Sequence, residues 1–275
     1  MAVGNAAWRR PWVVDSLAIA GVPAVLGAVF ALPRGLRSEH VLAYSRPTLV
    51  DALASHYVHL AADHLLANLF WYTLLVVPAY LLLVRTGNRD VFRAAFVTFL
   101  LAFPLAISGV NVLLPRPWTS VAFGFSAVVM AFAGLLTVAL GGSLAERYGL
   151  TTNYVPGVFL LGSAVIVGQV IGGSVTVSAA IVGVAIAVVP AVGRFRHDCV
   201  RTASLDRSET WLILAGTLVL GAALVVAFST QSANGQIVNL LAHLLGYCFG
   251  AVVPHTAALL DGHPSVPSAL DGRAD

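Results

Sequence analysis

Apolar runs of about 20 residues recur along the chain, separated by short segments rich in arginine, glycine and proline. A run of about that length crosses a bilayer core about 30 Å thick as a single helix. The short alternating segments of a membrane β-barrel do not occur. The pattern therefore predicts an all-α, polytopic transmembrane helix bundle of about eight helices, over residues 12–32, 63–84, 93–114, 121–141, 156–173, 174–193, 210–228 and 236–254.

Composition strengthens this interpretation. Of the 275 residues, 59% are hydrophobic and 10% are charged, whereas an average soluble protein has about one-quarter charged residues. The net charge of +3 comes from arginines scattered through short loops, which favours a lipid surrounding and not a nucleic-acid partner. Cys199 and Cys248 provide no disulfide framework. The run 12–32 is long enough to span, so we expect a retained first helix and not a cleaved signal.

The arginines also predict the orientation. With eight spans and a cytoplasmic N-terminus, eleven of the 15 basic residues, all arginine, fall on the inside and four on the outside, as the positive-inside tendency expects. Both termini are then cytoplasmic in a multi-pass protein of the cell membrane. We expect a transmembrane domain over 1–255, followed by a disordered cytoplasmic tail over 256–275.

Polar residues within the predicted spans are few, and such residues are functional hypotheses by default. His64 and Asn68 are four residues apart and therefore share one helix face. His243, Gly246 and Gly250 also share a face, on which the two glycines let another helix approach closely. In the eight-helix topology the spans that carry these residues run inward from the outer surface.

Ser126 lies in the apolar stretch 121–134 at a similar depth. Taken alone, a serine in a membrane helix is usually a packing residue. Here His243 falls about 10 Å below the start of its predicted helix, at 1.5 Å per residue, and His64 and Asn68 reach the same level. Asn239 lies one turn above His243 and is a candidate to line a cavity around these four residues. A hydroxyl, an imidazole and two further donors at one depth suit acyl transfer.

Three short motifs resemble the rhomboid family of intramembrane serine proteases. They are "HLLAN" (64–68), "GFSA" (124–127) and "AHLLGYCFG" (242–250), in the family's order and each on an apolar segment. His59 also matches a common upstream histidine of the family. The resemblance covers about 50–254, although the motifs themselves are few residues.

The resemblance implies a role for each matching residue. Ser126 is the expected nucleophile and His243 the general base, in a dyad without an acidic third member. His64, Asn68 and the backbone N–H of Ser126 are the expected oxyanion hole. The resemblance implies peptide-bond hydrolysis within membrane-protein substrates near the outer face, without a cofactor. Close helix packing around the site is expected at three glycines: Gly124, Gly246 and Gly250.

Some features depart from the family pattern. The residue after the serine is Ala127, and Met130 occupies a position where an aromatic ring often packs on the catalytic histidine. The segment "YSRPTLVDALASH" (44–56) is only loosely similar to the family's first outer loop. The family core has six helices, so two extra helices are expected between the serine and histidine helices.

Other functions are weaker interpretations of the same sequence. A catalytically inactive relative that binds membrane-protein clients would be expected to lack the serine or the histidine. A transporter would be expected to show an internal repeat. A zinc site is disfavoured because Asp63 and His64 point to different faces, and His56 and His59 are expected to bond loop carbonyls at the membrane interface. Asp15 is expected to make an interfacial or inter-helix polar contact, and Asn111 and Gln169 are expected to make packing hydrogen bonds.

Overall fold

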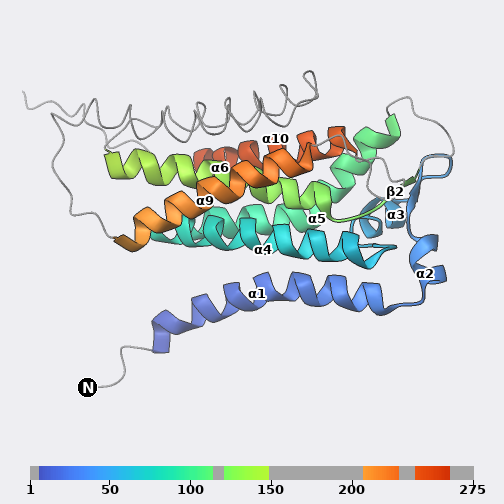
Figure 1. Cartoon of the computed structure of the whole chain (residues 1–275), viewed down its shortest axis with the longest axis horizontal. Coiled ribbons are helices and arrows are strands. Elements are labelled where there is room, and N and C mark those ends of the chain that lie inside the picture. The colour runs from blue at the N-terminus through green and yellow to red at the C-terminus, as the bar shows by residue number, and fades with distance from the viewer. Residues whose placement is uncertain (1–5, 114–120, 149–206, 229–238, 261–275) are drawn as a thin grey trace, which may run out of the picture. The chain divides into compact units, whose positions relative to one another are not determined.

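The fold is built almost entirely from helices. The computed structural model describes residues 6–113, 121–148, 207–228 and 239–260 (Figure 1). The described helices are α1 (Ala6–Ala31), α2 (Arg34–Glu39), α3 (Leu49–Ala54), α4 (Ala62–Arg85), α5 (Arg89–Leu113), α6 (Ser126–Tyr148), α9 (Arg207–Ala227) and α10 (Leu240–Leu260). Two short strands, β1 (Leu42–Ala43) and β2 (Val121–Ala122), pair in antiparallel register.

Five of the described helices are long and apolar enough to cross a membrane, and α10 contains a shorter apolar helix over Leu240–Pro254. These six match six of the eight predicted spans, so the chain is an all-α, multi-pass membrane protein. The predicted helices over 156–173 and 174–193 lie outside the described residues, as does Gln169.

Several predicted boundaries differ from those of the structure, and two helix starts have a clear cause. Helix α6 begins at Ser126 and not at 121, because Val121 and Ala122 pair with β1. Helix α10 begins at Leu240 and not at 236. The Asn239 side chain caps this start, because it accepts a hydrogen bond from the Ala242 N–H at 3.1 Å. The same helix continues to Leu260, and the rest of the tail expected to be disordered over 256–275 lies outside the described residues.

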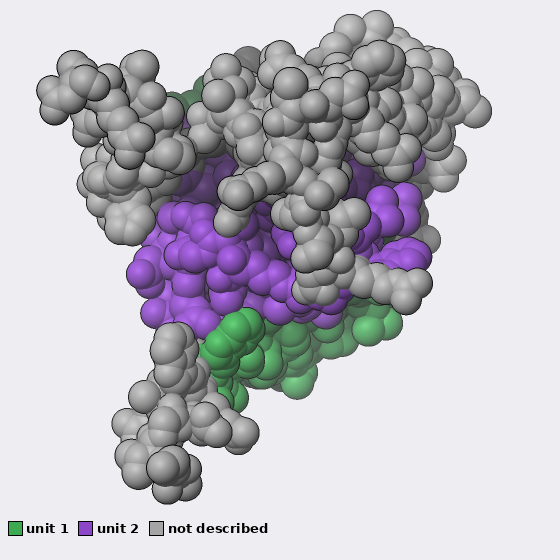
Figure 2. Space-filling view, turned by 90° about the vertical axis from the view of Figure 1, so that its left-hand side faces the viewer, with its two compact units in different colours: residues 1–72, 100–126 green, residues 73–99, 127–275 purple. Residues whose placement is uncertain are grey.

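The chain divides into two compact units, coloured separately in Figure 2. The first comprises residues 1–72 and 100–126, and the second residues 73–99 and 127–275. Helices α4 and α5 contribute residues to both units.

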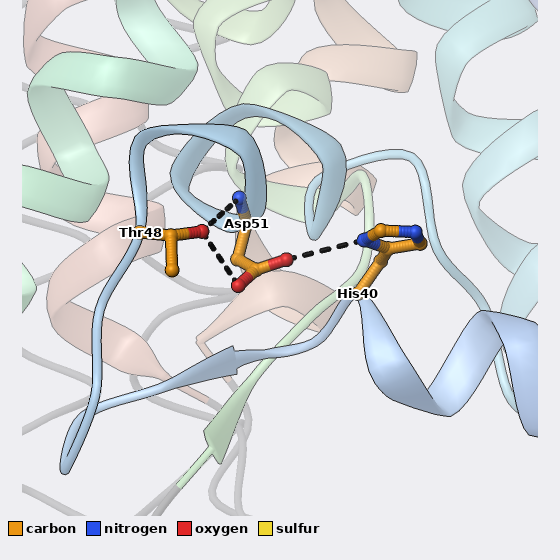
Figure 3. A network of polar contacts seen from close by, with 3 residues as sticks. All are labelled: His40, Thr48 and Asp51. Atoms are coloured by element: carbon orange, nitrogen blue, oxygen red, sulfur yellow. Dashed lines mark hydrogen bonds and ion pairs between the residues drawn. The ribbon is translucent and has the colours of Figure 1, made fainter.

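In the first unit, a short polar network fixes the segment between α1 and α4. The Thr48 hydroxyl accepts the Asp51 N–H at 3.0 Å and donates to the Asp51 carboxylate at 2.7 Å. The other carboxylate oxygen lies 3.2 Å from Nδ1 of His40, the residue that follows α2 (Figure 3). The hydrogen bond from Thr48 lowers the pKa of Asp51. These contacts cap α3 and join it to the end of α2.

In the second unit, α6 packs against both α9 and α10. The side chains of Leu136 and Leu140 in α6 lie beside Gly216 of α9. The rings of Phe96 and Phe99 from α5 contact Phe132 of α6, with centroids 5.7 and 5.4 Å apart. Helix α6 is therefore held by apolar contacts along several of its faces.

Candidate functional site

Ser126 is the first residue of α6 and follows a turn that only glycine can make. Gly124 has φ +105°, and a Cβ there would lie 2.5 Å from Cε1 of His64. The Gly124 N–H donates to the carbonyl of Ser55 at 2.9 Å. The His64 imidazole therefore sits directly over the peptide that leads into Ser126.

His59 connects this turn to α4. Its Nε2 lies 2.9 Å from Nδ2 of Asn68 and 3.4 Å from the backbone N of Phe125. Both partners are donors, so Nε2 accepts and the proton of the neutral ring is on Nδ1. The His59 side chain is fully buried, and its ring meets that of His64 in a T-shaped contact with centroids 5.0 Å apart.

His64 and Asn68 thus both reach His59 from one face of α4, as their spacing predicted. His56 and His59 are both buried within the protein, and their expected depth at the membrane interface stays a prediction. Nε2 of His56 lies 3.1 Å from the Ser108 hydroxyl, which donates to the carbonyl of Ala52 at 2.7 Å. Since Ser108 donates to a carbonyl and accepts from His56, this Ser–His pair links α5 to the end of α3 and is not arranged for nucleophilic attack.

His243 lies in the first turn of α10, about 4.5 Å from the helix start at 1.5 Å per residue, and not the 10 Å expected. Its Nδ1 lies 2.8 Å from the carbonyl oxygen of Ala227, the last residue of α9. A carbonyl only accepts, so Nδ1 carries the proton and Nε2 carries the lone pair in the neutral ring. That is the tautomer a general base requires when Nε2 faces its proton donor.

An aromatic ring does pack on His243, although Met130 cannot provide one. The Phe228 ring meets the imidazole edge-on, with centroids 6.1 Å apart and an interplanar angle of 87°. The sequence offered no signal for this contact, because Phe228 follows a different helix and lies well before the histidine motif.

Helices α6 and α10 pack backbone to backbone at the motif glycines. A Cβ on Gly246 would overlap the Ala127 carbonyl oxygen, and a Cβ on Gly250 would overlap the Ala131 carbonyl. The two contacts lie four residues apart on each helix and in the same order, so the helices run parallel. This direction is the one expected for the fourth and eighth spans.

The described parts of the chain place the candidate residues in both units. His64, Asn68 and Ser126 belong to the first unit, while His243 belongs to the second. The pairing of Ser126 with His243 therefore stays a prediction. Among the described residues, no group of three histidine, cysteine or acidic side chains is placed to hold a metal ion.

Comparisons with protein-family models, with curated proteins and with solved structures find no match. The resemblance of the three motifs to rhomboid proteases accordingly stays a prediction from the sequence.

Acid should weaken the segment that carries the two buried histidines. Burial lowers the pKa of His56 to about 4, and burial together with the neighbouring His64 lowers that of His59 to about 4. Between pH 6.5, the ordinary pKa of histidine, and pH 4, these two histidines bind more protons in the unfolded chain than in the folded one. The free energy of unfolding therefore falls as the pH falls. We expect a loss of about 2 kcal/mol per histidine between pH 7 and pH 5.

The variant His56→Gln provides the control, because its amide can still donate to Ser108 but does not titrate in this range. Thermal unfolding in detergent at pH 7 and pH 5 should show a smaller loss for this variant than for the wild type. Equal losses in the two proteins would contradict the assignment of His56 as a neutral, buried donor.

Proposed function

We propose that the protein is an intramembrane serine endopeptidase with Ser126 as nucleophile and His243 as general base. The packing of Ala127 on Gly246 carries the proposal. Ala127 directly follows Ser126, and Gly246 lies one helical turn after His243 on the same face of α10. The helices that bear the two reacting groups are thus held together within a turn of both.

In the proposed reaction, the Ser126 hydroxyl attacks a substrate carbonyl and passes its proton to Nε2 of His243. The peptide C–N bond then breaks, and His243 gives the proton to the leaving amine. Water attacks the resulting acyl-enzyme and releases the second product. The Ala227 carbonyl supports this exchange by accepting the Nδ1–H at 2.8 Å, in the position where many hydrolases use a carboxylate. It belongs to the C-terminal end of α9, where the helix dipole favours positive charge on the ring.

His64, Asn68 and the Ser126 backbone N–H are the proposed oxyanion donors. Both side chains contact His59, and the Gly124 turn brings the His64 ring against the backbone two residues before the nucleophile. No cofactor is required by this chemistry.

The proposed substrates are membrane proteins with a single span that unwinds near the outer surface, because a fully hydrogen-bonded helix hides its carbonyls. We further propose that both termini are cytoplasmic, as the arginine distribution indicates. The site then opens toward the outer side of the cell membrane.

Labelling with a serine-directed fluorophosphonate tests the proposal without a known substrate. Wild-type protein in detergent should be labelled, and Ser126→Ala should not. Ser143→Ala is the matched control, because Ser143 lies in the same helix with a buried hydroxyl that lacks a hydrogen-bond partner among the described residues. An unlabelled wild-type protein would favour the alternative, an inactive relative that binds membrane-protein clients.

Removing the Asn68 amide should reduce cleavage without abolishing it. We expect Asn68→Ala to lower kcat by about 10²–10³-fold, the usual cost of losing one oxyanion donor. Asn111→Ala is the control, since the Asn111 amide donates within its own helix to Ile107 at 3.0 Å and should leave kcat near the wild-type value. Cleavage of a single-span reporter in liposomes measures both, and a wild-type kcat in Asn68→Ala would remove this residue from the oxyanion hole.

A further inference from the structure

The buried imidazole of His59 serves two donors at once. One is the Asn68 amide of α4, at 2.9 Å, and the other is the Phe125 N–H of the turn that precedes α6, at 3.4 Å. Among the described residues, neither the Asn68 amide nor the Phe125 N–H donates to another side chain or loop carbonyl. The lone pair on Nε2 of His59 therefore links Asn68, a proposed oxyanion donor, to the Phe125 peptide beside Ser126.

The main chain of His59 is held as firmly as its side chain. The Arg37 guanidinium donates to the His59 carbonyl and to the carbonyl of Leu32. It also lies over the Phe30 ring, 4.3 Å from the centroid. These contacts tie His59 to α2 and to the end of α1, so the imidazole has little freedom to follow Asn68 or Phe125 if either one moves.

We propose that His59 is a positioning residue for the proposed protease, orienting the Asn68 amide and the Phe125 peptide so that the oxyanion donors stand in register with Ser126. This inference rests on the proposed function and adds to it a residue that contacts no reacting atom. Small misplacements of a donor are costly, because an error of about 1 Å can lower a rate by about 10²-fold. His59 supplies the acceptor that prevents such an error.

Two amide variants separate positioning from simple packing. In His59→Gln the carboxamide reaches the place of Nε2, so its oxygen can accept from both donors. In His59→Asn the carboxamide stops at the level of Nδ1 and cannot reach them. We expect His59→Gln to keep kcat within a few-fold of wild type, and His59→Asn to lower kcat by about tenfold to 10²-fold with little change in KM.

A double-mutant cycle of His59→Asn with Asn68→Ala shows whether His59 acts on kcat through Asn68. In an Asn68→Ala background, His59→Asn should cost much less than it does in the wild-type background, because contacting residues are not additive. The readouts are kcat and KM on the liposome reporter, with thermal unfolding measured for each variant.

Each outcome is decisive. A wild-type protein that is neither labelled nor active overturns the proposed function and the role of His59 with it. If the wild type is active, two results would overturn the positioning role alone. One is an equal kcat for His59→Gln and His59→Asn, and the other is a kcat loss in His59→Asn that is fully additive with that of Asn68→Ala. Equal kcat losses in both amide variants that track their thermal destabilisation would assign His59 to packing only.

Discussion

Replacing Gly250 by alanine is expected to push α6 and α10 apart and to destabilise the second unit. The new Cβ would overlap the backbone carbonyl of Ala131, and a backbone carbonyl inside a helix cannot rotate away as a side chain can. Relief requires the two helices to move apart along their whole contact. We expect a loss of about 3 kcal/mol or more, the upper part of the range for overpacking.

Gly142→Ala is the control, because Gly142 lies in α6, the helix against which Gly250 of α10 packs. Among the described residues, a Cβ at Gly142 meets nothing within 4 Å, so this change adds helix propensity without a clash there. It should raise stability by about 0.5–1 kcal/mol. Denaturant-induced unfolding in mixed micelles measures both variants. If Gly250→Ala proved as stable as Gly142→Ala, the backbone contact between α6 and α10 would be wrong.

The helices could be predicted from the sequence because lipid imposes a simple rule on them. About 20 apolar residues in a row must be helical to satisfy their own backbone groups, and this holds without knowing any neighbour. The starts of α6 and α10 could not be predicted in the same way. Each depends on a specific partner, which is β1 for the residues before Ser126 and the Asn239 side chain for α10.

The candidate site likewise contains features that the local sequence predicts and contacts that depend on distant segments. The shared face of His64 and Asn68, and the close approach at Gly246 and Gly250, follow from helix periodicity and from missing side chains. The partners of these residues come from distant segments. No local pattern indicates that His59 accepts from Phe125 or that Ala227 accepts from His243.

The variant His243→Asn should abolish cleavage while leaving the fold intact. The asparagine amide takes the place of Nδ1 and can still donate to the Ala227 carbonyl, so the link between α9 and α10 is kept. Nothing then occupies the position of Nε2, and the proton of Ser126 has no acceptor in the proposed mechanism. We expect kcat to fall on the order of 10⁴-fold and fluorophosphonate labelling to be lost.

His243→Ala separates the two uses of the ring, because it removes the base and the bond to Ala227 together. It should be as inactive as His243→Asn and in addition less stable by about 1 kcal/mol or more, the usual contribution of such a hydrogen bond. Reporter cleavage and thermal unfolding of both variants give the comparison. Cleavage by His243→Asn at the wild-type rate would mean that Nε2 takes no proton, and an intramembrane protease built on Ser126 and His243 could not then be maintained.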